Sequence, residues 1–177
     1  ELYEKVCKFS SYLKKLNLQK GDRVVAYVPN KIESIVCFLA CAKNGIIWSS
    51  CSPDFGAQGV VDRFKQIEPK VLITCDYYYY NGKKINIIDK VDQILKEISS
   101  IKNVIAYNYN KKEKEDLKNF INFEETLNSN LNENFERFEF DHPIYILFSS
   151  GTTGKPKCIT HGTGNVCLLY TSPSPRD

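Results

Sequence analysis

Apolar residues recur along the chain at two spacings, one typical of amphipathic helices and the other of buried strands. Leu2, Val6, Phe9, Leu13 and Leu16 repeat at helical spacing and predict a first helix with one apolar face. The same criteria predict further helices at 32–43, 58–67 and 87–98, and strands at 23–28, 46–48, 71–74 and 104–107. Strands that alternate with helices in this way predict an α/β fold, a doubly wound and mostly parallel sheet with flanking helices.

Polar segments separate these elements. Asn44-Gly45 is expected to end the second helix, and Asn81-Gly82 to form a turn after the tyrosines at 77–80. Residues 108–119 mix charges of both signs, which favours a solvated loop over a nucleic-acid patch. One short helix is expected within 119–134.

A loop rich in glycine and hydroxyl residues lies between two further predicted strands, at 145–148 and 157–161. The loop contains Ser149, Ser150, Gly151, Thr152, Thr153, Gly154 and Lys155. Glycines let backbone N–H groups approach a phosphate closely, hydroxyls donate hydrogen bonds, and lysines offset its charge. The loop is not a Walker A motif, because its glycines are too close together and Pro156 replaces the Ser or Thr. The alternative for the loop is an ordinary hairpin loop without a ligand. The alternative for Lys155 is a solvated lysine without a role in binding.

The pattern small-Ser-Gly-Thr-Thr-Gly-x-Pro-Lys resembles the phosphate-loop signature of the acyl-adenylate-forming (AMP-binding) superfamily. This resemblance implies that Ser149 to Lys155 bind the ATP phosphates and that Lys155 is the catalytic residue of the loop. It also implies Mg²⁺ as the partner of ATP. In that superfamily a carboxylate attacks the α-phosphate, and the CoA thiol then displaces AMP from the acyl-adenylate.

A second block, residues 45–70, begins Gly-Ile-Ile-Trp-Ser-Ser-Cys-Ser-Pro-Asp-Phe-Gly and resembles the acetoacetyl-CoA synthetases (acetoacetate–CoA ligases) within that superfamily. The resemblance covers residues 1–166 and implies an incomplete N-terminal domain, with acetoacetate, ATP and CoA as substrates of the whole enzyme. The piece alone is expected to be inactive. Two alternatives stay open: a ligase for another short acid, such as acetate or propionate, and a nucleotide-binding fragment without catalysis.

A weaker resemblance concerns CoA. Asn81, Gly82 and Lys83 correspond in position to a short basic segment that contacts the CoA phosphates in acetyl-CoA synthetases, and Lys84 adds a second cation. A hairpin tip with exposed lysines explains the same residues equally well.

Composition adds few constraints. The net charge of +3 gives no argument for nucleic acid or membrane, and no apolar run approaches the ~18 residues of a membrane span. The seven cysteines are scattered, and the only histidines are His142 and His161, so no metal site is predicted and a reduced, cytoplasmic setting is favoured.

Four smaller expectations concern single residues and the end of the chain. Trp48 is expected in the core rather than in a substrate channel, and Cys51 is not expected to be a catalytic thiol. His142, before Pro143, is expected at the surface. Residues 167–177 change character abruptly and are expected to be a non-native, adapter-like tail, the alternative being a genuine flexible one.

Overall fold

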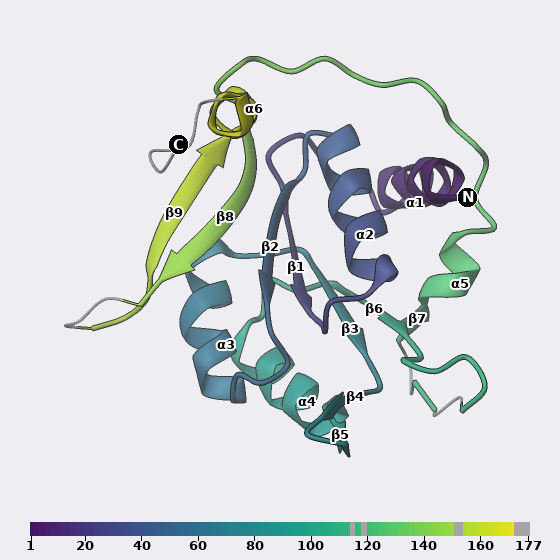
Figure 1. Cartoon of the computed structure of the whole chain (residues 1–177), viewed down its shortest axis with the longest axis vertical. Helices are drawn as coiled ribbons and strands as arrows, with labels where there is room; N and C mark the ends of the chain where they lie inside the picture. The colour runs from purple at the N-terminus through teal and green to yellow at the C-terminus, as the bar shows by residue number, and fades with distance from the viewer. Residues whose placement is uncertain (114–115, 118–119, 151–153, 172–177) are drawn as a thin grey trace.

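A computed structural model describes residues 1–113, 116–117, 120–150 and 154–171 of the chain (Figure 1). Within these residues seven strands form one sheet in the order β7-β6-β3-β1-β2-β8-β9. Every neighbouring pair is parallel except β8 and β9, which are antiparallel. The strands are β1 (Arg23–Tyr27), β2 (Ile47–Cys51), β3 (Val71–Cys75), β6 (Asn103–Tyr107), β7 (Ile121–Asn122), β8 (Pro143–Ser149) and β9 (Lys157–Gly162).

Helices cover both faces of the sheet. Figure 1 shows α1 and α2 on one side of the strands and α3 and α4 on the other. This arrangement follows from right-handed crossovers, because the chain moves from β1 to β2 in one direction and then back past β1 to β3. The helices are α1 (Leu2–Lys15), α2 (Ile32–Lys43), α3 (Ala57–Phe64), its 3-10 extension η1 (Lys65–Ile67), α4 (Ile88–Glu97), α5 (Phe123–Thr126) and α6 (Thr163–Thr171).

The predicted α/β fold is confirmed, and most predicted elements lie within a few residues of the observed ones. The core strands β1 and β3 are buried almost throughout, as apolar strands between two helical layers must be. Cys37 and Cys41 lie fully buried in α2 with free thiols. Helix α6 crosses the predicted tail boundary at residue 167, and residues 172–177 lie outside the described part.

A small hairpin stands apart from the main sheet. It consists of β4 (Tyr77–Tyr80) and β5 (Lys83–Asn86), an antiparallel pair inserted between β3 and α4. Its two-residue turn has Asn81 at φ 48° and Gly82 at φ 73°. Positive φ at both positions is typical of a type I′ turn, which Asn-Gly favours, so the predicted turn is confirmed.

The connecting segment, residues 128–142, runs from α5 around the outside of α1 and α2 to β8 (Figure 1). Lys43 donates to the backbone carbonyl of Asn134 at 2.5 Å, and Lys14 pairs with Glu136 at 2.6 Å. The last residue of the segment, His142, is buried rather than at the surface, so that expectation was wrong. Its Nε2 lies 2.9 Å from the carbonyl oxygen of Gly45, and its ring stacks on Phe138 with centroids 4.9 Å apart.

Candidate functional site

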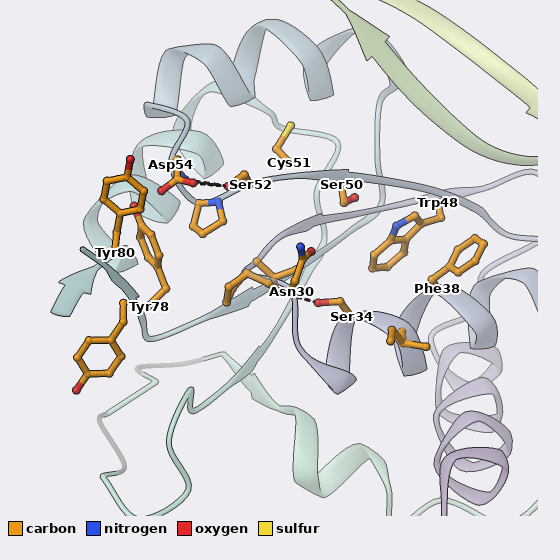
Figure 2. A pocket seen from close by; sticks show the side chains of 15 residues that line it. Asn30, Ser34, Phe38, Trp48, Ser50, Cys51, Ser52, Asp54, Tyr78 and Tyr80 are labelled. Atoms are coloured by element: carbon orange, nitrogen blue, oxygen red, sulfur yellow. Dashed lines mark hydrogen bonds between the residues drawn. The ribbon is translucent and has the colours of Figure 1, made fainter. Parts of the chain in front are cut away.

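A cavity of about 420 Å³ opens at the carboxyl ends of β1 and β2 (Figure 2). The connections that leave β1 and β3 run toward opposite ends of the sheet, and such a switch point is where open α/β sheets commonly bind ligands. Four segments line the cavity: the residues after β1, the first turns of α2, the end of β2 with its following loop, and the hairpin strand β4. They contribute Val28, Pro29, Asn30, Ser34, Ile35, Phe38, Trp48, Ser50, Cys51, Ser52, Pro53, Asp54, Tyr78, Tyr79 and Tyr80.

Hydrogen bonds from strand ends fix the loops around this cavity. The Tyr27 hydroxyl, at the end of β1, lies 2.6 Å from the carbonyl oxygen of Phe55 and 2.9 Å from that of Pro53. Burial raises the pKa of Tyr27, which keeps the hydroxyl a donor. Ser34 donates to the Pro29 carbonyl at 2.9 Å and so holds the start of α2 against the end of β1. The loop after β2 is therefore tied to β1, its neighbour in the sheet.

The polar groups of the cavity are donors and acceptors rather than nucleophiles. Ser52 donates to the Asp54 carboxylate at 2.8 Å, a contact drawn as a dashed line between the two labelled residues in Figure 2. Burial, with a further contribution from a hydrogen bond to Asp54, raises the pKa of Tyr78 to about 12. Burial also raises the pKa of Cys51 to about 11, so its thiol stays protonated at neutral pH.

Trp48 takes part in both the core and the cavity. Only 8% of it is exposed, yet it lies at the end of the cavity opposite the tyrosines (Figure 2). Its ring contacts Phe38 at a centroid distance of 6.3 Å, and Phe38 in turn contacts Tyr145 of β8 at 6.2 Å. This aromatic cluster links the cavity to the strand that carries the predicted phosphate loop.

The predicted phosphate loop follows β8 at the same edge of the sheet. Ser149 ends β8 opposite Lys157 of β9, and Ser150, Gly154 and Lys155 are exposed. Gly151, Thr152 and Thr153 lie outside the described residues. Buried Ser49 of β2 donates to the Ile146 carbonyl at 2.8 Å and ties β8 to the central strands.

Lys155 is next to α3 rather than in the large cavity. It borders a smaller hollow of about 300 Å³ with Gln58, Asp62 and Gln66. Gln66 donates to the Pro156 carbonyl at 2.9 Å, which anchors the far end of the loop to the turn after α3. Across the described residues Lys155 forms no ion pair with a carboxylate.

The residues expected at a CoA site lie beside the cavity. Asn81, Gly82 and Lys83 are exposed at the hairpin tip, immediately after cavity residue Tyr80. Lys84 lies over the Tyr77 ring, with its Nζ 3.9 Å from the centroid. Sequence reasoning missed the cavity residues Asn30, Ser34 and Asp54. Their positions in the sequence could have identified them as candidates, since Asn30 and Asp54 each follow the carboxyl end of a predicted parallel strand.

Metal-binding and membrane-spanning features are both absent from the part of the chain that the structure describes. It contains no group of three or more His, Cys, Asp or Glu side chains arranged to hold a metal ion. None of its helices has the length and apolar character needed to cross a membrane.

Residues 1–174 match the family model described as AMP-binding enzyme. Among curated proteins, the chain is 40% identical over 179 residues to an acetoacetyl-CoA synthetase of Macaca fascicularis, covering 96% of this chain and 27% of that protein. It is 43% identical over 176 residues to the acetoacetyl-coenzyme A synthetase of Rhizobium meliloti (strain 1021), with the same coverage. A malonamoyl-CoA synthetase of Penicillium aethiopicum is 39% identical over 172 residues, covering 92% of this chain and 24% of that protein.

Among solved structures, the acetoacetyl-CoA synthetase from Streptomyces lividans superposes with a TM-score of 0.90 at 37% identity, covering 96% of this chain and 26% of that one. The chain thus spans about a quarter of the length of these relatives. The resemblance that the loop and the Trp48 block carry is confirmed, as is the fold that it implied. The chain belongs to the AMP-binding enzyme family.

Proposed function

We propose that this chain is part of an ATP-dependent acetoacetate–CoA ligase. The observation that carries the proposal is 40% identity to an acetoacetyl-CoA synthetase along almost the whole chain, including the phosphate loop. In the first step an acetoacetate oxygen bonds to the α-phosphorus of ATP and pyrophosphate leaves. In the second, the sulfur of CoA bonds to the acyl carbon, the thiol gives up its proton, and AMP leaves.

The loop from Ser149 to Lys155 is proposed to bind the ATP phosphates. Ser150, Gly154 and Lys155 are exposed, and Lys155 has no carboxylate partner in the described part of the chain. Such a set of hydroxyl, N–H and ammonium donors suits a triphosphate, and Mg²⁺ would accompany ATP and neutralise part of its charge. Lys155 then stabilises charge on the leaving pyrophosphate.

CoA is proposed to bind along the hairpin, with Asn81, Gly82 and Lys83 near its phosphates. Support comes from the cavity at the sheet switch point, where the exposed ring of Tyr80 offers an aromatic face to a nucleobase. Lys83 pairs with Tyr80 across the hairpin and brings positive charge to that end of the cavity.

A second candidate function is that of a ligase for another short acid, which differs from the first in the acyl group. The malonamoyl-CoA synthetase of similar identity has a different acyl group in its name, which favours testing several acids. Initial rates of acetoacetate, acetate and propionate activation by the full-length protein separate these functions. We propose the cytoplasm as its location, since five cysteines are buried with free thiols, namely Cys7, Cys37, Cys41, Cys51 and Cys75.

The role of the loop is tested by Lys155→Ala in the full-length protein. Acetoacetate-dependent exchange of pyrophosphate into ATP should fall by about tenfold or more, because a charge-assisted contact worth ~1.5–3 kcal/mol is lost. Thermal unfolding should not change, since Lys155 is exposed. Lys102→Ala serves as the control, because Lys102 is an exposed lysine whose side chain donates to the nearby Ser99 carbonyl. Equal exchange rates for the Lys155 variant and the unchanged protein would refute the assignment.

A further inference from the structure

Gln66 connects the end of α3 to the far end of the predicted phosphate loop. It lies in η1, directly after α3, and its side chain is exposed. Its Nε2 donates to the carbonyl oxygen of Pro156 at 2.9 Å and to that of Asp62, one turn earlier in α3, at 2.6 Å. A side-chain amide has two N–H donors, so one is directed to the helix and the other to the loop. Gln66 is thereby fixed between the two.

The oxygen of the same amide makes a third contact, with the first residues of β9. The Cys158 thiol donates to the Gln66 Oε1 at 3.6 Å. If the amide were turned over, its oxygen would face the carbonyl oxygens of Asp62 and Pro156, two acceptors that cannot donate to it. The hydrogen bonds therefore define a single orientation of the amide, and both of its polar atoms are engaged.

The hairpin of β8 and β9 has few other attachments near its loop. The parallel ladder between β2 and β8 contains one register pair, Trp48 with Tyr145, which lies before the loop. Among the described residues 149–150 and 154–158, the hydrogen bonds that lead out of the hairpin are those with Gln66. Its side chain is thus the polar anchor of this end of the hairpin.

The anchor acts on Lys155 through the backbone. Lys155 directly precedes the anchored Pro156, and it borders the hollow of about 300 Å³ together with Gln66. The ring of a proline fixes its own φ, and it also restricts the backbone of the residue before it. Few free torsions therefore separate the held carbonyl from the Lys155 backbone. A cation on a fixed backbone loses less conformational entropy when it meets a ligand than one on a free loop.

We propose that Gln66 is a positioning residue for the adenylation step. It holds the Pro156 carbonyl so that Lys155 meets the ATP phosphates in one orientation, and it does not contact the nucleotide itself. This inference rests on the proposed binding of ATP by the loop. Because Lys155 is proposed to stabilise charge on the leaving pyrophosphate, a misplaced Lys155 should lower kcat and leave the KM for acetoacetate nearly unchanged.

The test compares Gln66→Met with the unchanged full-length protein, since Met has a similar length but no amide. The kcat of acetoacetate-dependent pyrophosphate exchange should fall about fivefold, equivalent to the ~1 kcal/mol of a neutral hydrogen bond. The KM for acetoacetate should change less than about twofold. Thermal unfolding should not change, because Gln66 is exposed. Gln66→His should restore most of the rate at about pH 8, where a neutral imidazole keeps one N–H donor.

Gln58→Met is the matched control. Gln58 is an exposed glutamine of α3 that lines the same hollow, but its amide donates to the Asp62 carboxylate at 2.8 Å rather than to the loop. Its replacement should leave kcat, KM and thermal unfolding unchanged. A loss of rate in Gln58→Met equal to that in Gln66→Met would show a general effect of altering this surface and would overturn the role of Gln66.

A double variant separates positioning from a merely structural role. In a Lys155→Ala background, Gln66→Met should lower exchange by less than about twofold, because the side chain that it positions is gone. The same fivefold loss in both backgrounds would overturn the proposal, as would unchanged exchange in Gln66→Met or no recovery in Gln66→His. Unchanged exchange in Lys155→Ala alone would overturn both this inference and the proposed role of the loop.

Amide hydrogen exchange tests the anchor without any activity. Residues 154–158 should exchange faster in Gln66→Met than in Gln58→Met, because the hydrogen bonds to Gln66 are lost. Equal exchange in the two variants would show that the anchor does not exist in solution. If the unchanged protein catalyses no acetoacetate-dependent pyrophosphate exchange, the proposed function fails, and this measurement still decides whether Gln66 holds the loop.

Discussion

Gly45 illustrates how one residue serves two contacts at once. It follows the end of α2 with φ 65°, as the Asn44-Gly45 pair predicted. Its carbonyl oxygen lies within hydrogen-bond distance of the His142 Nε2. A Cβ at this position would lie 2.5 Å from the Phe138 ring. The local role was predictable from the sequence, but the packing was not, because Phe138 and His142 lie more than ninety residues further along the chain. The same long-range contact explains why His142 was wrongly expected at the surface.

Gly45→Ala should therefore destabilise the protein more than a glycine replacement that affects the backbone alone. Left-handed backbone costs an L-residue ~1–2 kcal/mol, and overpacking against Phe138 adds ~1–3 kcal/mol. Gly21→Ala is the control, since Gly21 has φ 87° but a Cβ there would meet no atom within 4 Å. Urea unfolding midpoints of the two full-length variants provide the comparison. A midpoint for Gly45→Ala as high as that for Gly21→Ala would contradict the contact.

At the scale of elements, local patterns predicted most strands and helices, and the hairpin turn as well. The Asn81-Gly82 dipeptide specified its turn because both residues tolerate positive φ. The cavity was not predicted, since its walls come from four separate segments that only the folded sheet brings together. Trp48 shows the same limit: a lone Trp at the end of a predicted strand indicated the core, whereas in the folded protein it also lines the cavity.

The hairpin itself gives a prediction for CoA binding. Replacing Lys83 and Lys84 together by Ala in the full-length protein should raise the KM for CoA by about tenfold, because two cations near its phosphates are lost. The KM for ATP should stay the same, since ATP is proposed to bind at the loop after β8. Both constants come from initial rates at saturating acetoacetate. A parallel rise in the two KM values would show that the hairpin supports the structure as a whole rather than CoA.

At the scale of the whole molecule, the order of strands decides where ligands can bind. Sequence patterns indicated a parallel sheet but not which strands are neighbours, because the chain returns past β1 on its way from β2 to β3. That reversal creates the switch point and leaves β2 free to pair with β8. The cavity and the phosphate loop therefore lie at the same edge of the sheet. Residues 149–155 were identified as a candidate site by residue type and by resemblance to a family signature, and their role in binding ATP stays a prediction.

The 177-residue chain alone should form no acetoacetyl-CoA from acetoacetate, ATP and CoA. It spans about a quarter of the length of its relatives, and the resemblance implies that the adenine, ribose and later catalytic motifs belong to the remainder. Chromatographic detection of the thioester, with the full-length protein as the positive control, provides the measurement. Product formed at a rate comparable to that of the full-length protein would show that these residues suffice.

Strand β9 has a practical consequence for anyone who produces this piece by itself. Among the described residues it pairs with β8 only, and its exposed stretch from Lys157 to Thr160 includes Ile159, opposite the exposed Leu147 of β8. The open side of such a strand presents unpaired amides and carbonyls to any other copy that approaches. Purified copies of this piece are therefore expected to associate through the open side of β9 and to precipitate. Expressing a longer part of the protein, in which further residues cover this side of the strand, should keep the material in solution.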